Sequence, residues 1–353
     1  PATPTLPAWC IVCGPLGGVD FVLNIALFVP LGMGVGMLRG RVTPAVLAGV
    51  VVTLIVETLQ WRAVPGRDAS LGDVIANTSG AVSGAWLVLA GRSLTLASGR
   101  QAARLAYLAG ALACAVVGLA AWLLQPAPTR YPQWVQWQQR KPHLDPFVGS
   151  LRTLELNGNR LEANLRFPGA AILDRSTRST TVRAVVDGAT PPTRRLAMIG
   201  ASQNGLEEGF FLGQWGNALV FRSHLRAALL RLREPIISLE GAFGRQAPDA
   251  SRAESGDDSV FTIEARNANG ALTLTREAGG VTRRAILPLS VGLAWALVLP
   301  WDIPLGPRWV LANALFLGAL LAPVAYCTAR SARPVPDEHS MHAGWASLPV
   351  IGT

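Results

Sequence analysis

The sequence predicts an α-helical polytopic membrane domain joined to an all-β domain, a sandwich of the jelly-roll kind. Half of the 353 residues are hydrophobic and only 15% are charged, and the mean hydropathy is +0.33. A soluble domain usually carries about 25% charged residues, which argues against an ordinary soluble enzyme and against a disordered chain. Apolar runs near 20 residues recur, while a central stretch is polar and has short alternating segments.

Six apolar runs are long enough to be membrane helices: residues 19–38, 42–61, 70–90, 105–124, 285–300 and 309–327. They predict four domains or segments. Residues 1–124 form a four-helix membrane region, 126–284 a β domain, 285–328 two C-terminal transmembrane helices, and 329–353 a polar tail. The chain begins at Pro1 rather than Met, so we expect an upstream hydrophobic segment to be missing.

The central stretch has the features of a β-sandwich. Residues 126–284 hold 21 of the 31 basic residues and 15 of the 22 acidic ones. Their apolar side chains alternate over short segments, and Asn157-Gly158 and residues 267–270 read as hairpin turns. Many short strands with little helix signal are typical of a two-layer sandwich. We expect Trp215 to be at least partly buried in it.

Arginine-bearing loops predict the orientation in the membrane. Arg39 and Arg41 follow the first run, and Arg92, Arg100 and Arg104 follow the third. Short loops rich in arginine stay in the cytoplasm, so the β domain and the start of the first helix are expected outside. With six spans, Arg330 and Arg333 of the tail would lie on the outer side, which does not fit the rule.

Polar residues gather at the outer ends of three predicted helices. The carboxylates of Asp20, Glu57 and Asp73 each have an amide about one turn away on the same helix face. The amides and the two charged residues of the outer loop complete the predicted site: Asn24, Gln60, Asn77, Arg67 and Asp68. Ionisable residues at membrane depth are costly unless paired and suggest function. The alternative is that Glu57 pairs with Arg67 or with amides and only locks the helices together.

These residues carry a resemblance. The series is Asp20-x-x-x-Asn24, then Glu57-x-x-Gln60, then Arg67-Asp68 and Asp73-x-x-x-Asn77, ending in Gly80. It resembles the VanZ-like family of bacterial membrane proteins over residues 14–90. The resemblance implies a multi-pass protein of the bacterial inner membrane, in contact with the lipid bilayer and linked to teicoplanin-type glycopeptide resistance. The family's usual first helix is absent here, and Ser79 stands where a larger apolar residue is commoner.

The β domain more distantly resembles a laminin-G or concanavalin-type jelly roll. The resemblance rests on residues 180–186, 209–215 and 219–222, and it implies an outer domain that binds cell-wall glycan or peptide. Such domains sometimes hold calcium, but no acidic cluster here has a calcium-binding spacing. Trp215 is expected to be a core aromatic more than a sugar platform.

The sequence gives little support for catalysis, a metal or a cofactor. Cys10 and Cys13 form a lone C-x-x-C that predicts a local disulfide or two free thiols and no zinc site. No nucleophile elbow or phosphate loop is present, and the scattered basic residues do not favour nucleic-acid binding.

Two functions remain. The first is a non-enzymatic envelope protein with an outward polar pocket. The alternative is a membrane-embedded enzyme acting on a lipid-linked envelope precursor, with Glu57 and Asp73 as acid and base and Arg67 as an anion clamp. Transport is disfavoured because the inner halves of the helices carry no ionisable residue.

Overall fold

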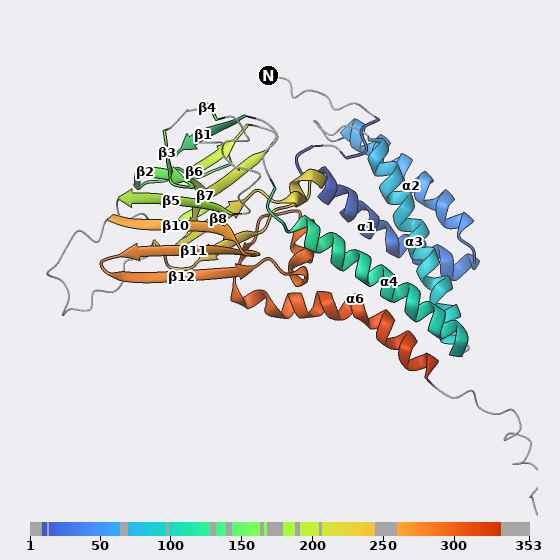
Figure 1. Ribbon diagram of the computed structural model, residues 1–353. Helices are drawn as coiled ribbons and strands as arrows, with labels where there is room; N and C mark the ends of the chain where they lie inside the picture. The colour runs from blue at the N-terminus through green and yellow to red at the C-terminus, as the bar shows by residue number, and fades with distance from the viewer. Residues whose placement is uncertain are drawn as a thin grey trace, which may run out of the picture.

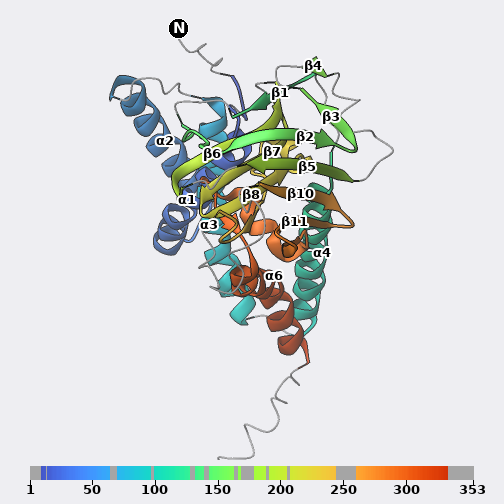
Figure 2. The ribbon, with the colours of Figure 1, turned by 90° about the vertical axis from the view of Figure 1, so that its left-hand side faces the viewer.

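The protein has a helical part and a β-rich part that lie end to end (Figures 1 and 2). The computed structural model describes residues 9–12, 14–63, 70–96, 99–127, 132–138, 143–162, 166–167, 179–187, 191–204, 207–243 and 260–332. The helices come from both ends of the chain, and the strands come from its middle. The predicted fold class, a helical membrane domain with a β-sandwich, is therefore confirmed.

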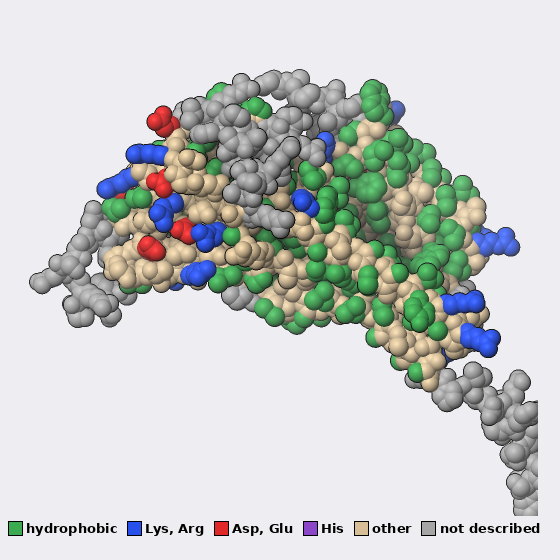
Figure 3. Space-filling view, in the orientation of Figure 1, with side chains coloured by type: hydrophobic (Ala, Val, Ile, Leu, Met, Phe, Trp, Pro, Cys, Tyr) green, Lys and Arg blue, Asp and Glu red, His purple; other side chains and the backbone are tan. Residues whose placement is uncertain are grey.

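Five helices of the described chain are long and apolar enough to cross a membrane. They are α1 (Gly17–Arg39), α2 (Thr43–Ala63), α3 (Leu71–Leu96), α4 (Gly99–Leu123) and α6 (Val310–Ser331). Their outward faces carry many exposed leucines, valines and isoleucines. In Figure 3 such side chains cover the helices, while arginines are seen mainly on the β domain and at the far helix ends. This distribution fits helices surrounded by lipid.

Small residues let α1 and α3 pack almost backbone to backbone. A Cβ added to Gly32 would lie 1.9 Å from the carbonyl oxygen of Ala81, and one added to Gly84 would lie 2.0 Å from that of Val29. Side chains larger than hydrogen are therefore excluded at both positions. Such close contacts are typical of small-residue faces between membrane helices. Gly34 differs, because an added Cβ there would meet open space.

The β domain consists of two sheets that enclose a common core. One sheet has the strand order β13-β9-β8-β7-β6-β1-β4 and the other β12-β11-β10-β5-β2-β3. The strands are β1 (Gln133–Trp137), β2 (Ser150–Leu156), β3 (Asn159–Leu161), β4 (Arg166–Phe167), β5 (Thr180–Asp187), β6 (Thr193–Gln203), β7 (Glu208–Gly216), β8 (Ala218–Ser223), β9 (Ile236–Leu239), β10 (Val260–Ala268), β11 (Ala271–Ala278), β12 (Val281–Pro288) and β13 (Pro304–Leu305). Neighbouring strands in the described sheets are antiparallel, except that β13 and β9 are parallel.

Period-two burial explains why these segments form strands. In β5 every second side chain is buried, from Thr180 to Val186, and these residues face a core shared with β7 and β8 of the other sheet. The predicted turns are present, because Asn157-Gly158 and Asn269-Gly270 adopt the positive φ values that a tight hairpin needs. Trp215 is half-buried in a smaller cluster, with Phe211 and Val220 among its buried members, as expected.

The predicted fifth transmembrane helix at residues 285–300 is wrong. Its first part belongs to β12, which pairs with β11, and its second part is a short 3-10 helix, η2 (Val291–Val298). This segment is apolar because it is buried on several sides. Leu293 and Ala296 reach the sandwich core, while Leu297 packs against Leu123 at the end of α4. Strand β13 then joins the seven-stranded sheet, and a short 3-10 turn, η3 (Pro307–Trp309), leads into α6, the one C-terminal span.

Candidate functional site

The first turn of α3 holds the best-defined part of the predicted polar cluster. Asn24 of α1 donates a hydrogen bond of 2.5 Å from its Nδ2 to Oδ1 of Asp73. Ser70 donates from its hydroxyl to Oδ2 of the same carboxylate at 2.8 Å, and its Oγ accepts a hydrogen bond from the Asp73 backbone N–H. Ser70 thus caps the N-terminus of α3 through the Asp73 N–H, and the bond from Asn24 links this end of α3 to α1.

Glu57 approaches the same region from α2. Ala45, Gly49, Thr53 and Glu57 recur every four residues and are the buried stripe of this helix. An added Cβ at Gly49 would lie 3.2 Å from the Cα of Thr78, so the stripe faces α3. Helices α2 and α3 are antiparallel, so a step along α2 towards its C-terminus is a step along α3 towards its N-terminus. Residues two turns beyond Gly49 on α2 therefore lie level with the first turns of α3. Glu57, with 8% of its surface exposed, is therefore at the level of Asp73.

Asn77 lies one turn further along α3 than Asp73. It is only 4% exposed, and its Oδ1 has no hydrogen-bond partner in the part of the chain that the structure describes. A buried amide oxygen without a donor costs about 1–3 kcal/mol. The described part of the bundle thus offers an unused acceptor close to the Asp73 carboxylate.

The remaining predicted site residues are placed differently. Asp20 is exposed in the first turn of α1, and Gln60 is half-buried near the end of α2. Arg67 and Asp68 lie outside the described residues, so the pairing of Glu57 with Arg67 stays a prediction. The structure brings Asn24 and Asp73 into contact. Asn77 lies one turn from Asp73, and Glu57 is buried on the stripe of α2 that faces α3. No group of three His, Cys, Asp or Glu within the described ranges is arranged to hold a metal ion.

A second charged cluster, which the sequence did not predict, lies where the β domain meets the helices. Arg222 of β8 donates from Nε to Oε1 of Glu208 at 2.7 Å and from Nη1 to Oδ1 of Asp302 at 3.3 Å. Arg233 also forms an ion pair with Asp302. Burial by itself lowers the pKa of Arg222, but the carboxylates of Glu208 and Asp302 outweigh it and raise that pKa.

His224 and Glu234 belong to the same cluster. Glu234 accepts a hydrogen bond of 2.7 Å from the Leu225 N–H, and its Oε1 lies 3.2 Å from Nδ1 of His224. Burial lowers the pKa of His224, but Glu234, aided by Glu207 and Glu208, raises it above 6.5. These partners are separated by up to 80 residues, so no local motif announces them.

The cysteines fall into two kinds. Cys10 is disulfide-bonded, which selects one of the two alternatives left open by the sequence, and Cys13 lies outside the described residues. Cys114 and Cys327 are free thiols. Cys10 also fixes the segment before α1 to the start of α3, because its carbonyl accepts a hydrogen bond from the Gly72 N–H at 3.3 Å.

Comparison with known proteins identifies a family for the part of the chain that forms the first three helices. Residues 4–92 match the family model VanZ/LLP1. No curated protein and no solved structure matches the chain, and no jelly-roll or laminin-G family is identified for the β domain. The match covers about a quarter of the chain, the quarter that holds α1, α2 and α3 with Asn24, Glu57, Asp73 and Asn77. The chain therefore carries a VanZ-like domain at residues 4–92, which is followed by a β-rich domain.

Proposed function

We propose that this protein is a VanZ-type component of the bacterial inner membrane that binds an envelope ligand at the outer end of α1, α2 and α3, without turning it over. The observation that carries the proposal is the buried amide oxygen of Asn77, which has no donor in the described chain. It lies one turn from Asp73 in the region that Glu57 approaches. A ligand hydroxyl or amide N–H reaching this region would satisfy it.

The orientation follows from five spans in place of six. With one C-terminal helix, Arg330 falls on the same side as Arg39, Arg41, Arg100 and Arg104, which removes the conflict noted in the sequence. The ends of α4 and α6 meet there, since an added Cβ at Gly99 would lie 3.5 Å from the carbonyl oxygen of Ser331. This side is the cytoplasm by the positive-inside rule. The disulfide-bonded Cys10 precedes the opposite end of α1. Disulfides persist in oxidising compartments, so this position agrees with an outer location of that end.

The ligand class we propose is a cell-wall glycan or a lipid-linked precursor of it. Both present hydroxyls and amides to the outer face of the membrane, where the β domain then lies as well. Through this ligand the protein would affect sensitivity to teicoplanin, which acts on the same outer surface. Binding of glycan or peptide by the β domain is part of the proposal, and retention of the full chain on purified cell-wall glycan tests it.

The alternative is an enzyme that uses Glu57 and Asp73 as acid and base. Two contacts disfavour it. Both carboxylate oxygens of Asp73 already accept hydrogen bonds, from Asn24 and from Ser70, which suits positioning more than proton transfer. Turnover separates the two functions: the purified full chain, incubated with a lipid-linked precursor, should bind it and release no product.

The binding function is tested with two variants that keep the size of the side chain nearly unchanged. Glu57→Gln removes a negative charge, and Asn77→Leu removes the amide oxygen that accepts a hydrogen bond. We expect both proteins to reach the membrane in normal amounts, and to lose precursor binding and any effect on teicoplanin sensitivity. Thr58→Val, at an exposed position of the same helix and outside the predicted site, is the control. Full binding by a well-expressed Glu57→Gln, Asn77→Leu double variant would refute the proposal.

A further inference from the structure

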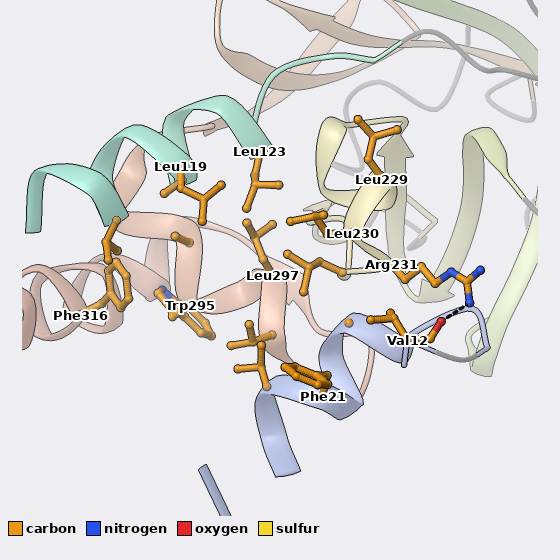
Figure 4. Close-up of a pocket in the computed structure, with 17 residues that line it drawn as sticks. Val12, Phe21, Leu119, Leu123, Leu229, Leu230, Arg231, Trp295, Leu297 and Phe316 are labelled. Atoms are coloured by element: carbon orange, nitrogen blue, oxygen red, sulfur yellow. Dashed lines mark hydrogen bonds between the residues drawn. The ribbon is translucent and has the colours of Figure 1, made fainter. Parts of the chain in front are cut away.

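A cavity separate from the polar cluster lies where the helices meet the β domain. It encloses about 620 Å³ and is lined by 17 residues, within the usual 300–1,000 Å³ of small-molecule sites. The lining comes from the outer ends of α1, α4 and α6, from η2, and from a short 3-10 helix, η1 (Arg226–Leu230). Figure 4 shows the side chains of Phe21, Leu119 and Leu297 around a common space.

The lining is apolar, and part of it faces the outside of the protein. Leu119 of α4 is 51% exposed, Leu230 of η1 is 45% exposed and Val22 of α1 is 37% exposed. Two of these residues lie in the outermost turns of apolar, membrane-length helices. In the orientation proposed above, on which this step rests, the hydrocarbon of the outer leaflet surrounds these turns, so the exposed part of the lining would contact acyl chains. A polar ligand would leave its own groups unpaired there.

Arg231 is the charged residue among those that line the cavity. Its aliphatic stem contributes to the lining, and its guanidinium points outward to the rim (Figure 4). There Nη1 donates to the carbonyl oxygens of Val12 at 2.6 Å and Gly14 at 3.2 Å. A guanidinium has five N–H donors in a fork that suits phosphate, so this rim can hold an anion as well.

The backbone at Arg231 adds weight to this reading. Its φ is +53°, at the end of η1 where glycine or asparagine is usual because a larger residue is strained. Strain of this kind is typical of functional positions. A glycine here would relieve it, but would lose the guanidinium at the cavity rim.

We propose that this cavity binds one hydrocarbon chain of an anionic lipid of the outer leaflet, with the lipid phosphate at Arg231. The chain replaces an empty apolar space with packed methylenes, and the phosphate accepts hydrogen bonds from guanidinium N–H groups. Because the cavity is bounded by α1 on one side and by α4 and α6 on the other, the bound chain would join the VanZ-like domain to the rest of the protein.

The test is photolabelling of the full chain in phosphatidylcholine nanodiscs with phosphatidylglycerol that carries a diazirine in one acyl chain. Adducts should map to residues 116–123 and 294–298. Leu119→Trp fills the cavity from an exposed position and should abolish these adducts. Leu112→Trp, on the same helix at a 66% exposed position outside the lining, should leave them unchanged.

Charge is tested in the same experiment. Arg231→Gln should lower labelling roughly tenfold, which is the size of one charge-assisted hydrogen bond to phosphate, and Arg231→Lys should retain much of it. Arg226→Gln is the control, because Arg226 lies on the same 3-10 helix but stacks on Trp122. Equal labelling by diazirine-bearing phosphatidylcholine, or adducts unaffected by Leu119→Trp, would overturn the proposal. Displacement by a polyprenyl phosphate would assign the site to a carrier lipid, and lack of displacement to a phospholipid.

Discussion

Asn24 on α1 and Asp73 on α3 are 49 residues apart in sequence, and a 2.5 Å hydrogen bond joins their side chains. The bond ties two helices at the same end at which Glu57 and Asn77 are buried. Between membrane helices such a bond contributes about 0.6–2 kcal/mol, because the separated helices also find other partners.

We expect Asn24→Leu to lower the free energy of unfolding by about 1 kcal/mol. The substitution removes the donor to Asp73 while keeping a side chain of similar size. The measurement is unfolding of the purified protein in mixed micelles, followed by circular dichroism. Ala26→Leu, at an exposed position half a turn away, should be neutral, and equal stability of the two variants would contradict the role given to Asn24.

The close contact of α1 with α3 predicts opposite effects on stability when alanine replaces Gly84 or Gly34. Gly84→Ala should destabilise the bundle by about 1–3 kcal/mol, because the new methyl would overlap the Val29 backbone. Gly34→Ala should be neutral or slightly stabilising, since nothing lies within 4 Å of the added Cβ and alanine favours helix. Thermal unfolding of both variants in the same detergent checks this, and a harmless Gly84→Ala would show that the helices can separate.

Asp302 neutralises two arginines at the base of the β domain. Asp302→Asn should cost about 3 kcal/mol, because Arg222 and Arg233 are 18% and 11% exposed and would lose their shared partner. The comparison is Asp187→Asn, which breaks an ion pair with Arg152, a side chain that is 52% exposed. That pair should contribute no more than about 1 kcal/mol. Chemical denaturation of both variants, followed by tryptophan fluorescence, gives the two values.

The stability of the β domain should depend on the protonation of His224. Its pKa is raised above 6.5 in the folded protein, so folding favours the charged imidazole. The stabilisation is complete below about pH 6.5, the pKa of unfolded histidine, and is lost as the pH rises through the folded pKa. His224→Gln should flatten this decline when unfolding is measured between pH 6 and pH 9. A wild-type protein whose stability rises over that range would contradict the pairing with Glu234.

The topology predicts which residues a membrane-impermeant thiol reagent reaches on intact cells. In a background with Cys114 and Cys327 replaced by serine, Asn217→Cys should react, because Asn217 is an exposed turn residue of the β domain. Arg41→Cys, between α1 and α2, should react only after lysis. The reverse pattern would place the β domain in the cytoplasm and would remove the basis of the proposed function.

The sequence by itself determined where most of the helices and strands lie. Period-two burial in β5 and turns such as Asn157-Gly158 are local properties. Runs of about 20 apolar residues likewise predicted α1 to α4 and α6. The i, i+4 spacing of Asp20 with Asn24 and of Asp73 with Asn77 predicted polar faces at one end of the bundle. It did not show that Asn24 would bond to Asp73 on another helix, since that depends on how closely α1 approaches α3.

Tertiary structure decided the features that depend on what surrounds a segment. Residues 285–300 are as apolar as a membrane helix, but β11 and the sandwich core bury them, and hydropathy does not distinguish burial in protein from burial in lipid. The ion pairs of Asp302 and the cavity beside Arg231 arise from segments up to about 300 residues apart. Such contacts form only when the chain folds, because charge pairing and packing act over a few ångströms in space at any separation along the sequence.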